Sequence, residues 1–468
     1  MEINKESLKT VSLSIDTVSK IFFYENRVFR AIYPEYISHV HQLINSNFLN
    51  KLVELGYFPK TWISDIEIDG FPLVLEHERI PYWNYPYEWS FEMLKEAALF
   101  VVKINKIANQ FDLELQDPHP FNVVFNMNKP QYIDFGSFVI KQNPEWSGFS
   151  EYFNYFYIPL YFWSRGYSTI ARNIFLMASV PTDNEYFKCR YSLGSLFGKR
   201  MLVLTYKIYS LIKKVSLSSE KNIKLKVRNK LKLFVALLIK KIFAKLFSVE
   251  NLEKNLKNLK YSAETSMWSE YHNDIDISKD ERFLRITTLL NQFTDAHSLL
   301  ELASNHGKFA SYLYDNSHIK HIIATDYDQT SIDIMYLNNE KRKGILPLLF
   351  DMIRTNGRIE DQAIYRRLKC DVVVALAVTH HLILSQSIPI EYILNTLSQL
   401  TNKYIMVEFM PLGLYSGSEN NTPALPSFYT LDWFKENFKN YFDLLHNEQL
   451  EINRHLFIGR IKVLQLEN

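Results

Sequence analysis

The sequence predicts an α/β protein in which an open parallel sheet forms the C-terminal part and an α+β region precedes it. Two observations lead to this fold class. From about Ser278 onward, continuous apolar runs alternate with helical patterns, as they do in a parallel sheet that helices cover on both faces. Before that point, β-rich runs lie close together and helical patterns follow them, which is typical of an α+β domain.

Length and composition exclude several classes of protein. The chain of 468 residues is too long for one ordinary domain, and its 47% hydrophobic and 22% charged residues exclude wholesale disorder. Two cysteines, Cys189 and Cys370, are too few for a disulfide scaffold or a cysteine-ligated zinc site, and we predict no metal site. The N-terminal residues contain no continuous apolar segment, so we expect a cytoplasmic protein without a signal peptide.

The first 145 residues contain the elements of one α+β domain. Two β-rich runs around Glu25 and Asn26 predict a hairpin over residues 18–34. The elements expected after it are a helix at 36–56, a strand at 71–80, a long helix at 89–109, and two short strands with polar loops at 113–125 and 130–140.

Residues 146–262 are expected to continue this domain as helices and a basic linker. The stretch from Lys199 to Lys260 carries 17 basic and three acidic residues, whereas the whole chain has a net charge of only +2. Within 221–246, lysines and apolar residues alternate at helical spacing, which favours a solvated helix with outward lysines. The alternative is a helix on an anionic membrane surface, at the inner face of a membrane. No nucleic-acid partner is expected, because aromatic interleaving and a recognisable binding module are missing.

Residues 263–468 are expected to form the parallel-sheet domain, with its boundary near 260–270. Five apolar runs predict buried strands, at 297–303, 321–326, 345–351, 371–377 and 403–409. Two further β-rich runs near the C-terminus have no helix between them and predict a terminal hairpin.

Acidic residues stand where three successive strands end. Glu301 lies at the end of the first strand, Asp326 ends the second and Asp351 ends the third. In an open α/β sheet, ligands bind outside the carboxyl ends of the strands. Asp326 is placed to accept both hydroxyls of a ribose, Asp351 to accept from an amino group of adenine, and Gly307 to let the backbone approach a ligand closely.

The segments ELASNHGKF, ATDYD, ILPLLFD, ALAVTHHL and VEF, in this order, resemble class I S-adenosylmethionine (SAM) dependent methyltransferases. The likeness covers about 265–465 and is greatest to the nodulation-protein-like subgroup. It implies a Rossmann-like seven-stranded sheet that ends in an antiparallel hairpin. It also implies that the methionine end of SAM is lined by Glu301, Ala303, Asn305 and Gly307, the ribose held by Asp326, and the adenine held by Asp351 and Met352.

One residue departs from the family pattern. Ala303 stands where these methyltransferases usually have glycine, and its methyl group is tolerable if φ is negative. A nicotinamide-dependent Rossmann enzyme is an alternative for the same strands. It needs a glycine-rich turn for the pyrophosphate, and only Gly307 is present here.

Three side chains after the fourth and fifth strands are candidate general bases. His380 and His381 follow the fourth strand, and Glu408 lies at the end of the fifth. An imidazole base predicts a pH–rate profile that falls below about 6–7. The alternative is that these side chains pack or cap the strands. The residues before the first strand that either close over SAM or pack in the core are Trp268, Tyr271 and Arg285.

A second pattern lies in the N-terminal part. Asp117 and Asn122 form a D-x4-N motif, and Asp134 begins a DFG tripeptide. These segments resemble the catalytic and metal loops of protein kinases and aminoglycoside kinases, which implies a kinase-like domain that would use Mg-ATP if active. A glycine-rich phosphate loop is absent, and Arg30 stands where the lysine of a V-A-I-K motif is expected. The alternative is that the three residues only support a loop or an acceptor-binding surface.

Three functions remain open at this point. The first is a methyltransferase for a glycan or small-molecule hydroxyl, with a degenerate kinase-like domain that binds the acceptor. The second is a bifunctional kinase and methyltransferase of a bacterial surface glycan. The third is a non-enzymatic scaffold.

Overall fold

In the computed structural model, the chain forms two compact units. The first comprises Met1–Met93, Val124–Ile133 and Glu264–Asn468, and the second comprises Leu94–Val123 and Asp134–Ala263. The predicted three-part division at 145 and 262 stays a prediction. The basic segment at 221–246, the expected boundary near 260–270, Trp268 and Tyr271 lie outside the described residues. The structure describes residues 8–10, 16–177, 249–261, 276–353, 363–415 and 423–462.

A seven-stranded mixed sheet dominates the C-terminal part of the first unit. Its strands lie in the order β12-β11-β10-β13-β14-β16-β15. The first five are parallel, and β16 runs antiparallel to both of its neighbours. All five predicted strands and the terminal hairpin are therefore confirmed. The bounds are β10 Ser298–Leu302, β11 His321–Asp326, β12 Ile345–Leu349, β13 Cys370–Ala375, β14 Thr401–Phe409, β15 Phe442–Glu451 and β16 Arg454–Ile461.

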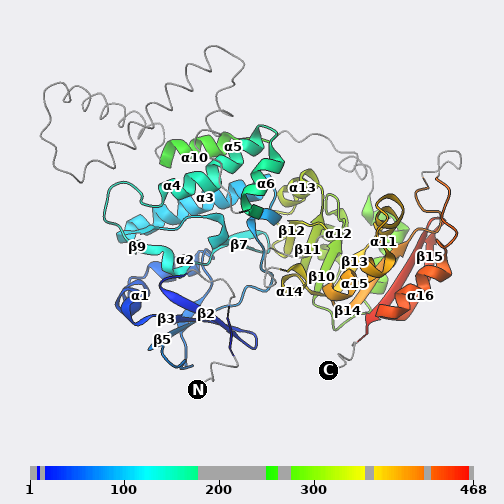
Figure 1. Cartoon of the computed structure of the whole chain (residues 1–468), viewed down its shortest axis with the longest axis horizontal. Coiled ribbons are helices and arrows are strands. Elements are labelled where there is room, and N and C mark those ends of the chain that lie inside the picture. Colours follow the sequence, from blue (N-terminus) through cyan, green and yellow to red (C-terminus); the bar gives the residue numbers. More distant parts are fainter. Residues whose placement is uncertain are drawn as a thin grey trace, which may run out of the picture. The chain divides into compact units, whose positions relative to one another are not determined.

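Helices lie between the strands of this sheet in sequence (Figure 1). The strands β10 and β12 are buried along their whole length, which explains why their sequences are almost continuously apolar. Asp280 and Asp328 cap two of the helices, because their carboxylates accept hydrogen bonds from the first free backbone amides. The helices are α11 Glu281–Leu290, α12 Lys308–Asn316, α13 Gln329–Asn338, α14 Ile364–Arg367, α15 Ile390–Leu400 and α16 Leu431–Tyr441.

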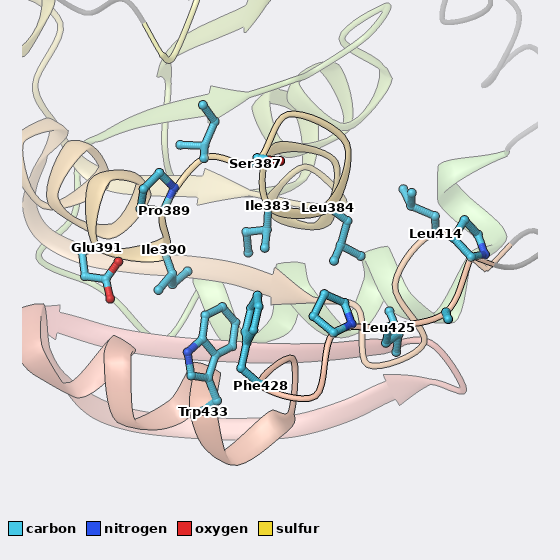
Figure 2. A pocket seen from close by; sticks show the side chains of 14 residues that line it. Ile383, Leu384, Ser387, Pro389, Ile390, Glu391, Leu414, Leu425, Phe428 and Trp433 are labelled. Carbon is cyan, nitrogen blue, oxygen red and sulfur yellow. The ribbon is translucent and has the colours of Figure 1, made fainter.

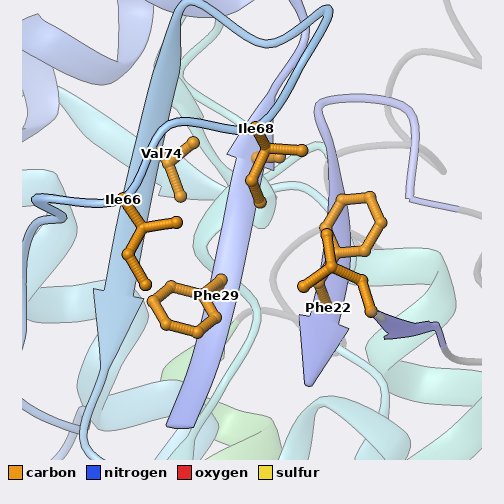
Figure 3. Close-up of a cluster of buried hydrophobic side chains, with 7 residues drawn as sticks. Phe22, Phe29, Ile66, Ile68 and Val74 are labelled. Atoms are coloured by element: carbon orange, nitrogen blue, oxygen red, sulfur yellow. The ribbon is translucent and has the colours of Figure 1, made fainter. Parts of the chain in front are cut away.

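The first unit also contains a five-stranded antiparallel sheet from the N-terminal part. Its order is β1-β2-β3-β5-β4. The predicted hairpin is confirmed as β2 and β3, and Glu25 in its turn has a φ of +51°. One face carries a core of Leu8, Phe22, Phe29, Ala31, Ile66, Ile68 and Val74 (Figure 3). The bounds are β1 Lys9–Thr10, β2 Ser19–Tyr24, β3 Arg27–Ile32, β4 Thr61–Ile63 and β5 Leu73–His77.

The helix expected at 36–56 is two helices. α1 covers Ile37–Asn45 and α2 covers Phe48–Glu54. Asn47 between them adopts a left-handed conformation with φ +58°, which a continuous right-handed helix does not allow. Asparagine is among the few residues that accept this conformation readily.

A buried ion pair joins distant parts of the first unit. Arg367 Nη2 lies 2.5 Å from Glu88 Oε1, and both side chains are about 95% buried. The guanidinium of Arg367 also lies over the ring of Tyr85, at 4.8 Å from its centroid. Nearby, the rings of Phe125 and Tyr336 meet edge to face. Segments that are hundreds of residues apart in the chain thus share one buried contact region.

The second unit is mainly helical. Tyr152 donates a hydrogen bond to the carbonyl of Ala98, and Trp146 donates one to the carbonyl of Leu115. The region 113–140 contains four short strands rather than the two predicted. Two of them, β6 and β9, lie in this unit, whereas the β7–β8 hairpin, which turns at Met127 with φ +56°, lies almost wholly in the first unit. The bounds are α3 Phe91–Ala108, β6 Leu113–Leu115, β7 Val123–Asn126, β8 Lys129–Tyr132, β9 Phe138–Ile140, α4 Phe149–Tyr152, α5 Ile158–Ser164, α6 Ser168–Met177 and α10 Val249–Asn258. In the parts of the chain that are described, no helix has the length and apolarity needed to cross a membrane.

Candidate functional site

The sheet brings the predicted acidic residues to one edge. Glu301 lies near the carboxyl end of β10, Asp326 is the last residue of β11, and Asp351 follows β12. The three strands are neighbours and parallel, so their carboxyl ends lie side by side. Ile353 donates its amide to Asp351 Oδ1 at 3.0 Å, which places Asp351 and Met352 in a short turn at the same edge.

The loop between β10 and α12 has an unusual backbone. Ala303, Asn305 and Gly307 all have positive φ, at +54°, +51° and +65°. Ala303 therefore does not have the negative φ under which its methyl group is tolerable. Glycine is required at position 307 for two reasons. The backbone is in the left-handed region there, and a Cβ would lie 2.5 Å from Met335 Cγ.

Asp326 connects this loop to β11. Its carboxylate accepts hydrogen bonds from the amides of Asn305 and Asp328, each at 2.8 Å. Burial raises the pKa of Asp326, and these backbone hydrogen bonds oppose that shift. Each carboxylate oxygen has a second lone pair, so Asp326 retains acceptor capacity for two hydroxyl groups.

Glu301 is a buried carboxyl group whose Oε2 has no hydrogen-bond partner among the described residues. Burial is the largest cause that raises its pKa to about 8, and the charge of Asp326 adds to the shift. A buried acid of this kind lacks a positive counterpart, and a cationic ligand would supply one.

The two predicted histidines lie together after β13. His380 immediately precedes the π-helix His381–Ser385, and the two rings are 4.0 Å apart between centroids. Burial, followed by the charges of His381 and Arg454, lowers the pKa of His380 to about 3. Burial also lowers the pKa of His381. Both imidazoles are therefore neutral at pH 7 and able to accept a proton.

Glu408, the third candidate base, is fully buried in β14. Its Oε2 lies 3.0 Å from Arg454 Nη1, and Arg282 Nη1 lies 3.5 Å from both carboxylate oxygens. Glu408 is thus held between two guanidinium groups. Sequence reasoning missed Arg282 and Arg454, since no local pattern connects them with Glu408.

Arg285, which was expected either to close over SAM or to pack in the core, lies elsewhere on α11. Its guanidinium forms two hydrogen bonds with Glu448 of β15, at 2.8 and 3.0 Å. Arg282, one turn earlier, is the buried arginine of this helix.

A cavity of about 530 Å³ lies beside the segments that follow β13 and β14 (Figure 2). Ile383 and Leu384 belong to the π-helix that begins at His381, whereas Leu414 follows the end of β14. The outer wall contains Phe428 and Trp433, whose ring centroids are 5.1 Å apart. No local sequence pattern indicates this cavity, because its walls come from three separate segments.

The kinase-like motif residues come together in the second unit. Asn122 Nδ2 donates to the carbonyl of Asp117 at 2.8 Å and to Asp134 Oδ2 at 3.4 Å. Asp134 Oδ1 accepts from the amide of Gly136 at 3.1 Å. Burial, with a smaller effect of the Asp117 charge, raises the pKa of Glu151 to about 7. Within the described ranges, no group of three or more His, Cys, Asp and Glu residues is arranged to hold a metal ion.

Arg30, the counterpart of the expected kinase lysine, is buried in the first unit. Its Nη1 lies 2.5 Å from Asp16 Oδ2 and 2.8 Å from Ser19 Oγ, and its Nε lies 3.3 Å from His77 Nε2. These contacts give Arg30 a structural place in the N-terminal sheet. The kinase-like identity of the N-terminal part stays a prediction.

No family model matches the chain. Among curated proteins it is similar to nodulation protein NoeA of Rhizobium meliloti (strain 1021), with 24% identity over 420 residues that cover 84% of this chain and 81% of NoeA. Among solved structures it is similar to the N-methyltransferase NodS from Bradyrhizobium japonicum WM9, with 11% identity over 40% of this chain and 98% of NodS and a TM-score of 0.30. It is also similar to PH0226 from Pyrococcus horikoshii OT3, with 16% identity over 41% of this chain and 99% of PH0226 and a TM-score of 0.32. The chain is thus a distant homologue of NoeA, and its seven-stranded sheet with an antiparallel hairpin at one end is the sheet that the sequence resemblance to methyltransferases implied.

Proposed function

We propose that this protein is a SAM-dependent methyltransferase that acts on a hydroxyl group of a glycan or a small molecule. The observation that carries the proposal is the position of Asp326. Its carboxylate ends β11, is fixed by two backbone amides, and adjoins the left-handed loop at Ala303, Asn305 and Gly307. This combination of an acid and a close backbone approach at neighbouring strand ends suits the ribose and methionine parts of SAM.

The residues of the sheet edge fit SAM chemically. Glu301 has an orphaned buried oxygen, and an ammonium group supplies both the donor and the positive charge that it lacks. Asp326 has lone pairs for two ribose hydroxyls, and Asp351 is placed to accept from the adenine amino group. When bound, SAM supplies a methyl group on a positively charged sulfur, which is electrophilic.

We infer that His380 or His381, rather than Glu408, takes the proton of the acceptor. The imidazoles are neutral at pH 7, whereas Glu408 is already paired with Arg282 and Arg454. The imidazole would take the proton of the acceptor hydroxyl, and bound SAM would supply the methyl group that replaces this proton on the oxygen. A positioned base of this kind typically accelerates a reaction by about 10²–10⁴.

Calorimetry with S-adenosylhomocysteine tests the proposal. Asp326→Asn keeps one oxygen acceptor for the loop amides but removes the charge that strengthens hydrogen bonds to a ribose. Hydrogen bonds to a charged group are worth about 1.5–3 kcal/mol, so we expect affinity to fall about 10- to 100-fold. Asp315→Asn, at an exposed ion pair with Arg342, is the control and should bind normally. Unchanged affinity in Asp326→Asn overturns the assignment, and a folded wild type that binds neither SAM nor S-adenosylhomocysteine favours the scaffold.

We further propose that Asp117, Asn122 and Asp134 support a loop and do not transfer phosphoryl groups. Asp134 caps the amide of Gly136, and Asn122 bridges Asp117 and Asp134. These hydrogen bonds connect the three residues to one another and to the backbone of the loop. The bifunctional alternative requires magnesium-dependent turnover of ATP, which is its direct test.

A further inference from the structure

The cavity beside the candidate methyl-transfer residues has an almost entirely apolar lining. Of the 14 residues around it, Glu391 is the only charged one, and Ser387 is the only other polar side chain. Ile383 and Leu384 lie across from the aromatic wall of Phe428 (Figure 2). A volume of about 530 Å³ is in the range of cavities that bind small organic molecules.

Several contacts fix the inner wall of this cavity. Gly413 has φ +59°, and a Cβ there would lie 2.5 Å from Leu425 Cδ2 and 2.7 Å from Leu384 Cδ1. The missing side chain therefore lets both leucines of the wall approach the backbone. The buried Asn453 accepts from the amide of Leu412 at 2.6 Å and donates to the carbonyl of Gly413 at 3.3 Å. Because these contacts hold the wall in place, we expect a preformed cavity rather than a gap between mobile loops.

Two large apolar side chains of the lining are in contact with solvent. Phe428 is 51% exposed and Leu425 is 36% exposed, although both line the cavity. Apolar side chains that gather around one opening are typical of a ligand site. Ile383 and Leu384 belong to the π-helix whose first residue is His381, so the cavity adjoins the segment that carries one of the proposed bases.

We propose that this cavity holds the aromatic part of a neutral acceptor whose hydroxyl group is methylated. The inference rests on the proposed methyltransferase function and names the class of its acceptor. The rings of Phe428 and Trp433 offer stacking or edge contacts to a planar group. Among the described lining residues there is no cation, and their one carboxylate, Glu391, repels anions. A phosphorylated or carboxylated acceptor is therefore disfavoured relative to a phenol of the same shape.

Two probes of equal ring size test the inference by calorimetry at pH 7. They are 2-naphthol, which is neutral, and 2-naphthoate, which is anionic. We expect the wild-type protein to bind 2-naphthol about tenfold more tightly than 2-naphthoate, and Glu391→Gln to narrow that gap. Phe428→Ala should weaken 2-naphthol binding about fivefold through the lost ring contact. Leu445→Ala is the matched control, because Leu445 is apolar and 49% exposed but lies on β15 outside the lining.

The outcomes separate this inference from the proposed function. Binding of S-adenosylhomocysteine without binding of 2-naphthol overturns the acceptor site and leaves the methyltransferase proposal standing. Equal affinity for the two probes overturns the preference for a neutral acceptor. Unchanged 2-naphthol affinity in Phe428→Ala, with the circular dichroism of the wild type, overturns the assignment to this cavity. Binding of 2-naphthol that depends on Phe428, in a protein that binds no S-adenosylhomocysteine, overturns the acceptor role together with the proposed function.

Discussion

Ala303 occupies a backbone position that is costly for any residue with a side chain. Its φ of +54° lies in the left-handed region, which costs an L-residue roughly 1–2 kcal/mol. Glycine adopts this conformation without that cost. Its greater conformational freedom in the unfolded chain, however, offsets about 0.4–1 kcal/mol of the stability that the substitution would add.

We expect Ala303→Gly to raise the free energy of unfolding by about 0.5–1 kcal/mol, as the difference of these two effects. Urea unfolding measures it. Ala363→Gly is the matched control, because Ala363 has φ −58° and gains nothing from glycine, so that variant should be destabilised. If both variants lose stability equally, the left-handed conformation of Ala303 is wrong.

The histidines lead to a pH prediction that differs from the one made from sequence. An imidazole base works only when neutral, so the rate falls as pH drops below its pKa in the protein. Burial lowers the pKa of both His380 and His381, the former to about 3. We therefore expect kcat/KM to stay level from pH 8 to well below the ordinary histidine value near 6.5.

His380→Gln and His381→Gln identify which imidazole is the base. The variant that lacks the base should lose turnover and the acid limb of the profile while it still binds S-adenosylhomocysteine. A profile that falls between pH 6 and 7 in the wild type contradicts the lowered pKa values. Full turnover in both variants makes the histidines structural.

Among the secondary-structure elements, the strands were predicted correctly where their residues are buried along the whole strand. The strands β10 to β14 are enclosed on both faces, so their apolar runs are continuous and easy to recognise. Prediction failed where one residue redirects the backbone: Asn47 divides the expected helix, and Met127 turns an expected loop into a hairpin. The pairing of Glu408 with Arg282 and Arg454 was also missed, because it spans 126 and 46 positions of sequence.

The loop of Asp134 provides a prediction at this scale. Asp134→Asn keeps an oxygen that accepts from the amide of Gly136, so the turn should survive. We expect an unchanged melting temperature and unchanged affinity for S-adenosylhomocysteine. Asp134→Ala, which removes the cap, should cost about 1 kcal/mol of stability. Magnesium-dependent ATP turnover by the wild type, abolished by Asp134→Asn, would contradict a purely structural loop.

At the scale of the whole molecule, the ion pair of Arg367 and Glu88 spans 279 positions of sequence within one unit. Removing one partner leaves a buried charge uncompensated, which typically costs about 3–5 kcal/mol. We expect Arg367→Met to lower the free energy of urea unfolding by about that much, and a second change, Glu88→Leu, to restore part of the loss. Glu436→Gln, in an exposed pair with Lys439, should change stability by at most about 1 kcal/mol. Equal effects of Arg367→Met and Glu436→Gln would show that the Arg367 pair is not buried.

The turn between β15 and β16 also has a consequence for how the protein is made. Asn453 holds the cavity loop, and Arg454 holds Glu408, which comes 46 positions earlier in the chain. During synthesis, the strand that carries Glu408 emerges before the arginine that balances it. A nascent chain that ends before Asn453 thus contains all the parallel strands. Its Glu408 lacks Arg454 as an ion-pair partner, and its cavity wall lacks the hydrogen bonds of Asn453. The cavity to which we assign the acceptor can therefore form only after Asn453 and Arg454 have been synthesised, whereas the sheet edge that we assign to SAM is complete much earlier.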